Sequence, residues 1–207
     1  MRNRVILFSL VTLLSVYGAS ANLLTNPSWE TGDLTGWNTW GGGTMENNFY
    51  GFTAQDGTYF VTEWTDAGRY QAVSVTPGQT YNLSAWVASA AGDVLWGDGL
   101  GYFKLEWLNS AGGVISSSQI SFNTIGTADL TIPTNTWTLL TLNSLVAPAN
   151  AASGQVLTAM WASGDTGGGR ALYDNVSFDT AAVPEPGVAA ALGLGGLVLL
   201  ALRRRRV

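Results

Sequence analysis

Short runs in which every second residue is apolar fill the middle of the chain. The clearest runs follow the turn at 76–79 and precede the turn at 109–113, with apolar positions at Tyr81, Leu83, Ala85 and Val87, then Phe103, Leu105 and Trp107. This period of two predicts half-buried β-strands. Similar runs cover 69–75, 115–122, 137–145, 155–162 and 171–178. At least seven strands and no helical period predict an all-β domain, a β-sandwich of two packed antiparallel sheets.

The first 21 residues have the pattern of a secretory signal peptide. Arg2 and Arg4 precede an apolar run at 5–16, and Ala19-Ser20-Ala21 is a small-x-small cleavage motif. Twelve mainly apolar residues span about 18 Å as a helix, which is short for a hydrocarbon core of about 30 Å. We therefore expect signal peptidase to cleave after Ala21 and the rest of the chain to be exported.

The last 25 residues form a second targeting segment. A Pro-Glu-Pro triplet precedes a short apolar helix at 188–202, which a basic cluster follows; the residues are Pro184, Glu185, Pro186, Arg203, Arg204, Arg205 and Arg206. The cluster keeps the terminus cytoplasmic. This tail closely resembles the PEP-CTERM sorting signal of Gram-negative bacteria. The resemblance implies an inner-membrane intermediate, removal of the tail by an exosortase, and a product at the cell surface or secreted; an ordinary tail anchor is the alternative.

Charge and composition narrow the chemistry of the remaining body, 22–182. It holds thirteen of the fourteen acidic residues but only Arg69, Lys104 and Arg170 as basic ones. Such a body repels phosphate backbones, which argues against nucleic acid as a partner. The chain has no His and no Cys. Imidazole and thiolate catalysis, Cys-based zinc sites and disulfides are therefore excluded.

Three stretches of the body resemble carbohydrate-binding modules of the 4/9 group. They are the opening segment 22–37, with its Asn-Pro-Ser-Trp-Glu and Gly-Trp motifs, the segment 75–87 and the closing segment 172–178. The resemblance implies a β-jelly roll for the sandwich. It also implies a structural Ca²⁺ held by Glu30 and Asp174, with backbone carbonyls near Asn26 and Thr31 completing the shell.

The closing strand gives an independent reason to look for a cation. By the period of two, Asp174 shares a face with Leu172, Val176 and Phe178. A carboxylate among apolar side chains needs a partner, and the body has few basic residues. Ca²⁺ is one candidate for this partner. Hydrogen bonds from backbone amides at the end of the sheet are the other.

The nine tryptophans, all in the body, exceed what a core of this size usually holds. Two of them, Trp40 and Trp96, lie among glycines and are expected on exposed loops. Indole faces stack on sugar rings, and nearby polar groups bind hydroxyls, so the candidate sugar contacts are Trp40, Tyr50, Trp96 and Asp98. We expect the core to take Trp37, Trp86, Trp107, Trp137 and Trp161.

These observations favour an exported, exosortase-sorted protein of the cell envelope or matrix whose jelly-roll domain binds an extracellular polysaccharide without catalysis. The alternative is a structural or adhesive surface protein of the same fold with no glycan site. An enzyme would have to use carboxylates alone, as a glycosidase does. No pair stands out by spacing among Glu46, Glu63, Asp66, Asp93, Asp98 and Glu106.

Overall fold

The computed structural model describes residues 21–162 and 166–181, which belong to one compact unit. The expected signal peptide and sorting tail lie outside this part. Its elements are strands: β1 (Asn38–Glu46), β2 (Phe60–Ser74), β3 (Thr80–Ala88), β4 (Trp96–Gly97), β5 (Leu100–Leu108), β6 (Val114–Asn123), β7 (Leu130–Thr131), β8 (Thr138–Val146), β9 (Ser153–Trp161), β10 (Gly167–Gly168) and β11 (Arg170–Thr180). In the described ranges, no helix is long and apolar enough to cross a membrane.

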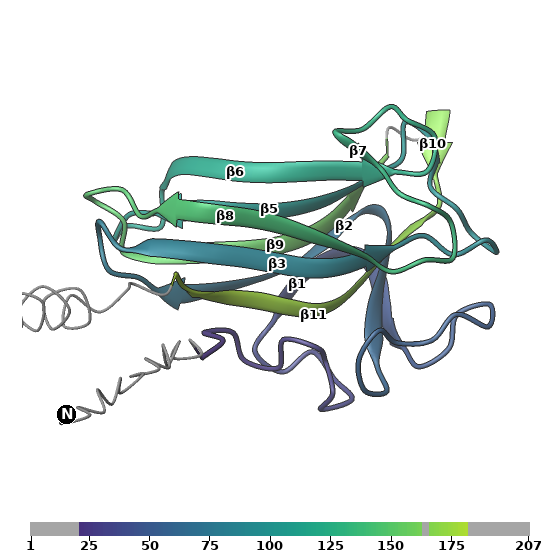
Figure 1. Cartoon of the computed structure of the whole chain (residues 1–207), viewed down its shortest axis with the longest axis horizontal. Helices are drawn as coiled ribbons and strands as arrows, with labels where there is room; N and C mark the ends of the chain where they lie inside the picture. The colour runs from purple at the N-terminus through teal and green to yellow at the C-terminus, as the bar shows by residue number, and fades with distance from the viewer. Residues whose placement is uncertain (1–20, 163–165, 182–207) are drawn as a thin grey trace, which may run out of the picture. The chain divides into compact units, whose positions relative to one another are not determined.

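The strands form the expected two-layer sandwich, although their hydrogen bonding is continuous (Figure 1). Nine strands belong to one sheet in the order β7-β6-β5-β9-β2-β11-β3-β8, with β1 beside β2, and β4 pairs with β10. Every pairing is antiparallel except the short one between β6 and β7. The sheet curls so that β6, β5 and β9 form one layer and β11, β3 and β8 the other.

Strand β2 forms the corner between the layers. Its first half pairs with β11 through Trp64, and its second half pairs with β9 from Ala67 onward. Between the halves, Thr65 has a φ of 60°, and the facing strand β1 changes register around Gly41, whose φ is 64°. Such bulges bend a strand and let it pass from one sheet to the other.

The core lies between the layers and follows the predicted alternation. The positions predicted to be buried in β3 and β5 are all at most 3% exposed. Fully burying one such aliphatic or aromatic side chain stabilises the fold by roughly 1.5–3 kcal/mol. The period of two therefore placed these strands correctly.

A bulge in β11 overturns one sequence expectation. Asp174 pairs with Trp86 but Ser177 pairs with Ser84, so β11 carries one extra residue here, and Asn175 has a φ of 45°. Beyond the bulge, Val176 and Phe178 face the main core, whereas Asp174 and Leu172 face the other side of the layer. The prediction that these four side chains share a face is wrong, because an inserted residue reverses the alternation.

The opening segment is tied to this last strand. Leu23 N donates to Phe178 O (2.8 Å), Phe178 N donates to Asn22 Oδ1 (3.1 Å) and Val176 N donates to Pro27 O (2.9 Å). Trp29 is fully buried, with its ring centroid 5.2 Å from that of Trp37. Although 21–37 forms no strand, it closes one side of the sandwich.

Candidate functional site

A groove lies on the outer face of the β1-β2-β9-β5-β6 layer. Its central row consists of residues that pair across neighbouring strands, in the order Trp40, Gly68, Ala159, Tyr102 and Ser121. The next row is Asn38, Tyr70, Leu157, Lys104 and Gln119. Because side chains alternate between the faces of a strand, all of these point away from the core.

The residues of the central row give the groove its shape. Its middle positions are Gly68 and Ala159, and its flanks carry the rings of Trp40 and Tyr102. A Cβ atom at Gly68 would collide with Trp40 Cη2, so the indole lies over this glycine. The resulting cavity measures about 420 Å³ and is lined by Trp40, Asp66, Tyr102, Lys104, Gln119, Leu157, Ala159, Met160 and Trp161.

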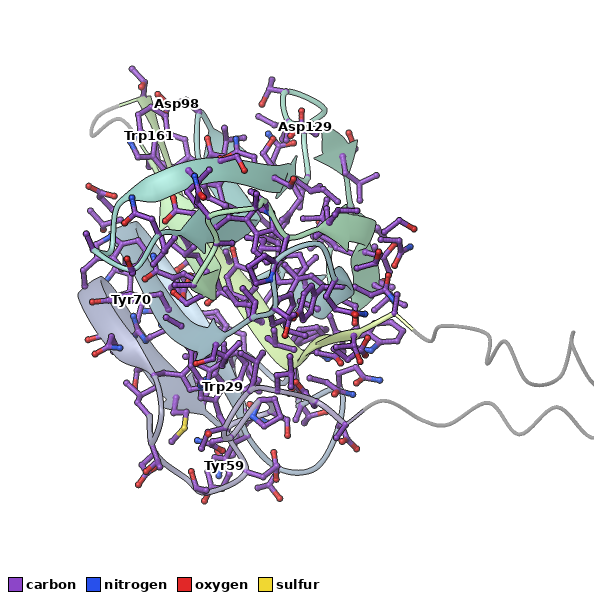
Figure 2. The ribbon with its side chains drawn as sticks, turned by 90° about the vertical axis from the view of Figure 1, so that its left-hand side faces the viewer. Trp29, Tyr59, Tyr70, Asp98, Asp129 and Trp161 are labelled. Atoms are coloured by element: carbon purple, nitrogen blue, oxygen red, sulfur yellow. The ribbon has the colours of Figure 1, made fainter. Side chains whose placement is uncertain are left out.

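Aromatic rings continue along the same side of the molecule. Figure 2 shows Tyr70 and Trp161 on one side of the ribbon. The ring centroid of Tyr70 lies 6.0 Å from that of Trp40, and 42% of Trp161 is exposed. The groove thus offers several partly exposed rings over a floor of small side chains.

Polar contacts border the groove in two places. Lys104 Nζ lies 2.6 Å from Glu106 Oε1, and Gln155 Nε2 donates to Glu106 Oε2 (3.0 Å). At the β6 margin, Asp129 accepts hydrogen bonds from the backbone amide and hydroxyl of Ser121 (2.8 and 2.7 Å), which lower the pKa of Asp129. Burial and the charge of Asp129 raise the pKa of the Tyr102 phenol. Tyr102 is therefore a neutral hydroxyl, able to donate and accept hydrogen bonds.

Tyr173 supports the groove from the core side. Its hydroxyl accepts a hydrogen bond from Tyr102 N (3.0 Å) and lies within hydrogen-bond distance of the carbonyls of Tyr102 and Ala159. Tyr102 and Ala159 are a cross-strand pair of β5 and β9. The phenol is thus inserted into the ladder directly below the floor. It fixes the backbone that carries the Tyr102 ring.

A buried polar cluster lies beside this tyrosine. Glu63 is fully buried, and its Oε1 accepts a hydrogen bond from the Thr158 hydroxyl (2.9 Å). Glu63 Oε2 and Arg69 Nε have no hydrogen-bond partner among the described residues. Burial raises the pKa of Glu63 to about 8, although the charge of Arg69 opposes this shift. Burial also lowers the pKa of Arg69.

Only Trp40 of the four predicted sugar contacts lines the groove. It belongs to β1 and not to a loop, so that expectation was wrong; the edge position of β1 tolerates its glycines. Trp96 and Tyr50 are exposed, at 49% and 72%, but neither lines the groove. Tyr50 packs on Phe49. Asp98 accepts a hydrogen bond from the Thr166 hydroxyl and does not line the groove.

The other aromatic rings of the groove, those of Trp161, Tyr70 and Tyr102, were not predicted as sugar contacts from the sequence. Trp161 was expected in the core, but it ends β9 on the outer face. Tyr70 and Tyr102 were not singled out. Both lie at positions that the alternation leaves outward, as the pairs of β2 and β5 with β9 confirm. Aromatic residues at outward positions of predicted strands were thus the available signal.

The predicted metal ligands Glu30 and Asp174 bind one loop, 55–59. Asp174 Oδ2 accepts from the amides of Gln55 (2.8 Å) and Asp56 (3.1 Å), while Oδ1 accepts from the Asn175 amide (2.7 Å). Glu30 accepts from the amides of Thr58 and Tyr59, both at 2.8 Å. Asp174 is fully buried, and burial together with the charge of Glu30 raises its pKa to about 6.

Asn26 and Thr31 lie near Glu30 in the opening segment, and their oxygens have different hydrogen-bond partners. The Asn26 carbonyl already accepts hydrogen bonds from Trp29 N (3.2 Å) and Trp37 Nε1 (3.0 Å), which occupy its two lone pairs. The Thr31 hydroxyl donates to Asp33 Oδ1 (2.8 Å). In the part of the chain that the structure describes, no three acidic side chains lie grouped around a common point, so carboxylates alone would supply at most two ligand groups.

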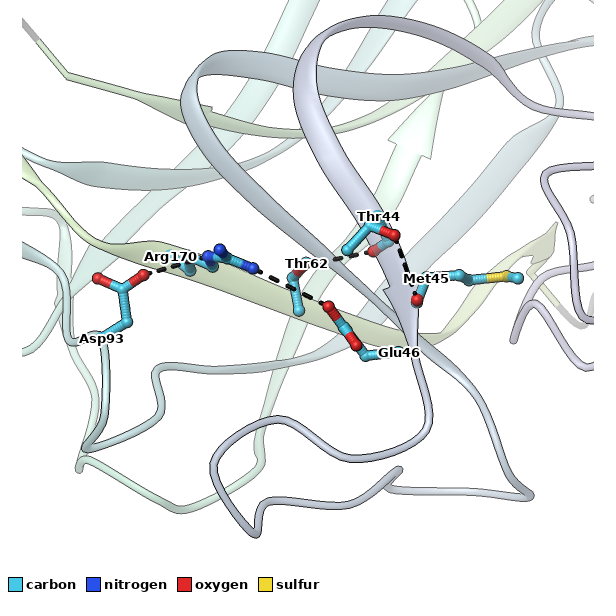
Figure 3. Close-up of polar contacts among 6 residues, drawn as sticks. All are labelled: Thr44, Met45, Glu46, Thr62, Asp93 and Arg170. Atoms are coloured by element: carbon cyan, nitrogen blue, oxygen red, sulfur yellow. Dashed lines mark hydrogen bonds and ion pairs between the residues drawn. The ribbon is translucent and has the colours of Figure 1, made fainter.

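The last basic residue, Arg170, joins four segments at one end of the sandwich. Its Nε lies 3.1 Å from Asp93 Oδ2, and its Nη1 lies 4.0 Å from Glu46 Oε1 (Figure 3). Its Cζ lies 4.1 Å from the ring centroid of Trp64 and 4.6 Å from that of Phe49. A smaller cavity of about 220 Å³ adjoins it, lined in part by the glycines at 167–169. Arg170 thus acts as a structural cross-link.

Known structures share this fold. TmCBM61, a carbohydrate-binding module solved in complex with β-1,4-galactotriose, matches 78% of this chain and 100% of its own, with a TM-score of 0.54 and 17% identity. The CBM22-1 xylan-binding domain from Paenibacillus barcinonensis matches 80% of this chain and 97% of its own, with a TM-score of 0.54 and 18% identity. These matches show that the body shares the jelly-roll fold of these modules.

A third match is part of a larger protein. The enzymatically active domain of bacteriophage CBA120 tailspike protein 4 matches 77% of this chain but only 21% of its own length, with a TM-score of 0.55 and 17% identity. No protein-family model and no curated protein matches the sequence. The two carbohydrate-binding modules belong to families 61 and 22, so membership of the 4/9 group stays a prediction.

Proposed function

We propose that the body binds an extracellular polysaccharide, without catalysis, in the groove on the β1-β2-β9-β5-β6 layer. The observation that carries this proposal is the central row, in which Trp40 and Tyr102 flank the small residues Gly68 and Ala159. A pyranose ring presents an apolar C–H face that stacks on aromatic rings. The cavity of about 420 Å³ lies in the usual range for small ligand sites.

The polar groups around the rings suit sugar hydroxyls. Tyr102 and Gln119 line the cavity and can both donate and accept hydrogen bonds. Their backbone lies on paired strands, so no backbone segment that carries them has to become ordered on binding. Two of the structural neighbours are a module in complex with β-1,4-galactotriose and a xylan-binding domain, which agrees with this proposal.

The carboxylates support a non-catalytic role. Hydrolysis of a glycosidic bond ordinarily requires two carboxyl groups facing the same bond. Among the described residues that line the groove, Asp66 is the one carboxylate. Glu106 lies in the adjoining row and is engaged with Lys104 and Gln155.

Affinity electrophoresis tests the proposal. The full chain is purified in a polyoxyethylene detergent, which has no sugar head group, and run through gels that contain soluble glycans, including the exopolysaccharide of the producing cell. We expect at least one glycan to retard the protein and Trp40→Ala to abolish the retardation. Trp96→Ala is the matched control, because it removes an exposed indole outside the groove. Unchanged migration in every glycan would leave the structural or adhesive role instead.

Export and sorting complete the proposed function. The signal peptide at 1–21 and the sorting tail at 183–207 would direct the acidic body across the inner membrane, where signal peptidase and an exosortase would act on the two ends. The mature protein would then face polysaccharide at the cell surface or in the matrix. Mass determination of the secreted product tests this, since cleavage after Ala21 and loss of the basic cluster each change the mass.

A structural Ca²⁺ at Glu30 and Asp174 is part of the proposal. The pair suits a cation because Asp174 is fully buried near a second carboxylate, and each carboxylate keeps lone pairs beyond its hydrogen bonds. Asn26 is less suitable, since its carbonyl is doubly hydrogen-bonded. Thr31 remains the second backbone candidate. When bound, Ca²⁺ would supply charge compensation and hold loop 55–59 to the last strand.

A further inference from the structure

We propose that the groove prefers a polysaccharide that carries ammonium groups, such as a glycan of free amino sugars, over neutral and anionic glycans. This inference rests on the proposed function and names the chemical class of its ligand. It is carried by an unpaired carboxylate, Asp66, that lines the groove together with two partly exposed indoles, Trp40 and Trp161.

Asp66 lies at one end of the groove. Ala67 and Met160 form the last cross-strand pair of β2 and β9 at this end. Because the strands are antiparallel, Asp66, one residue before Ala67, and Trp161, one residue after Met160, both lie just beyond this pair. Trp40 pairs with Gly68 on the other side of β2. The Asp66 residue is exposed, and in the described ranges no hydrogen bond or ion pair engages its carboxylate.

The basic residues of the described part are engaged elsewhere. Lys104, the cation of the groove lining, is paired with Glu106 at 2.6 Å. Arg69 is buried in the core, and Arg170 cross-links the far segments. Asp129 adds a further carboxylate near Tyr102 at the β6 margin. A uronate or sulfate in this groove would therefore meet net negative charge, whereas an ammonium group would be attracted.

Aromatic faces and a carboxylate together recognise a cation. The face of an indole attracts an ammonium group, which raises the affinity about two- to fivefold at an exposed site. An exposed ion pair raises it by up to about fivefold more. These two contributions correspond to roughly a tenfold gain in affinity over the same glycan without the charge. A neutral sugar would gain only the stacking and the hydroxyl hydrogen bonds.

Three hexasaccharides that differ only at C2 test the proposal by isothermal titration with the full chain in polyoxyethylene detergent. They are the β-1,4-linked hexamers of glucose, N-acetylglucosamine and glucosamine, which carry a hydroxyl, an acetamide and an amine at C2. The titrations use a buffer acidic enough to protonate this amine to an ammonium group. We expect the glucosamine hexamer to bind about tenfold more tightly than the other two, with an advantage that shrinks as salt rises. Asp66→Asn should remove most of that advantage. Asp56→Asn, an exposed carboxylate outside the groove, is the matched control and should preserve it.

The outcomes separate this inference from the proposed function. Equal affinity for the three hexamers, or an ammonium preference that Asp66→Asn leaves intact, overturns the inference. In either case, binding that Trp40→Ala abolishes still supports glycan recognition by the groove. Failure of all three hexamers to bind also overturns the inference, and the wider gel panel then decides the proposed function separately.

Discussion

Glu30 and Asp174 bind opposite ends of the same loop. Glu30 lies in the opening segment and accepts hydrogen bonds from the amides of Thr58 and Tyr59. Asp174 lies in the last strand and accepts hydrogen bonds from the amides of Gln55 and Asp56. The loop therefore joins the two ends of the body. The backbone-amide alternative for Asp174 is present in the structure, and the proposed Ca²⁺ would reinforce the same connection.

Removal of calcium should lower the thermal stability of the protein. If Glu30 and Asp174 share a Ca²⁺, EDTA lowers the Tm and added Ca²⁺ restores it, because a ligand that binds only the folded state stabilises it by mass action. Scanning calorimetry measures the shift. Glu30→Gln should reduce the response to calcium, and Asp33→Asn, a carboxylate without a contact to loop 55–59, should not. Equal melting with and without the chelator would reject the metal but leave the loop contacts intact.

The buried Glu63 should make stability fall as pH rises. Its pKa is raised to about 8 in the fold from 4.5, so the folded state keeps a proton that the unfolded state releases between these values. The free energy of unfolding therefore decreases across this window. Asp174 acts in the same direction only up to about pH 6, so the slope between pH 6 and 8 reports Glu63.

Glu63→Gln separates this contribution. The amide is neutral at all these pH values, so the variant should lose a slope of at most about 1.4 kcal/mol per pH unit between pH 6 and 8. Urea unfolding at several pH values measures the slope in both proteins. Asp33 and Asp129 have lowered pKa values and affect stability only in more acidic solution. A slope that the substitution leaves unchanged would contradict the assignment.

Tyr173→Phe should loosen the groove floor. The phenol oxygen accepts a hydrogen bond from the Tyr102 amide inside the β5–β9 ladder, and its loss leaves that part-buried amide without this bond, at a cost of about 1 kcal/mol. Urea unfolding gives the cost, and amide hydrogen exchange at Tyr102 locates it. Tyr70→Phe removes a hydroxyl from the outer face and serves as the control. Faster exchange at Tyr102 in both variants would argue against a specific role for Tyr173.

Arg170→Lys should destabilise the end of the sandwich although it keeps the charge. The guanidinium lies against the rings of Trp64 and Phe49 and pairs with Asp93, and a lysine ammonium cannot reproduce this planar stacking. The side chain is 24% exposed, so the expected loss is about 1 kcal/mol. Thermal or urea unfolding measures it. A lysine variant as stable as the wild type would show that charge alone is sufficient.

Much of the fold was predictable because its signal is local. The alternation in 81–87 and 103–108 identified β3 and β5, and four further runs matched β6, β8, β9 and β11. The run at 69–75 covered only the second half of β2. Strand β1 was missed because the Gly-Gly-Gly sequence after Trp40 is typical of a loop. The face of Asp174 was mistaken because the bulge at Asn175 leaves no mark in the pattern of apolar residues.

The sequence by itself determined seven of the strands, the acidic and disulfide-free body, and the exposure of Trp96. These properties depend on composition and on neighbours along the chain. Only the tertiary structure decided that Trp40, Tyr102 and Trp161 line one groove, and that Glu30 and Asp174 bind one loop. The reason is that strand register and bulges are set by pairing between segments far apart in the chain, and a one-residue shift moves a side chain to the opposite face.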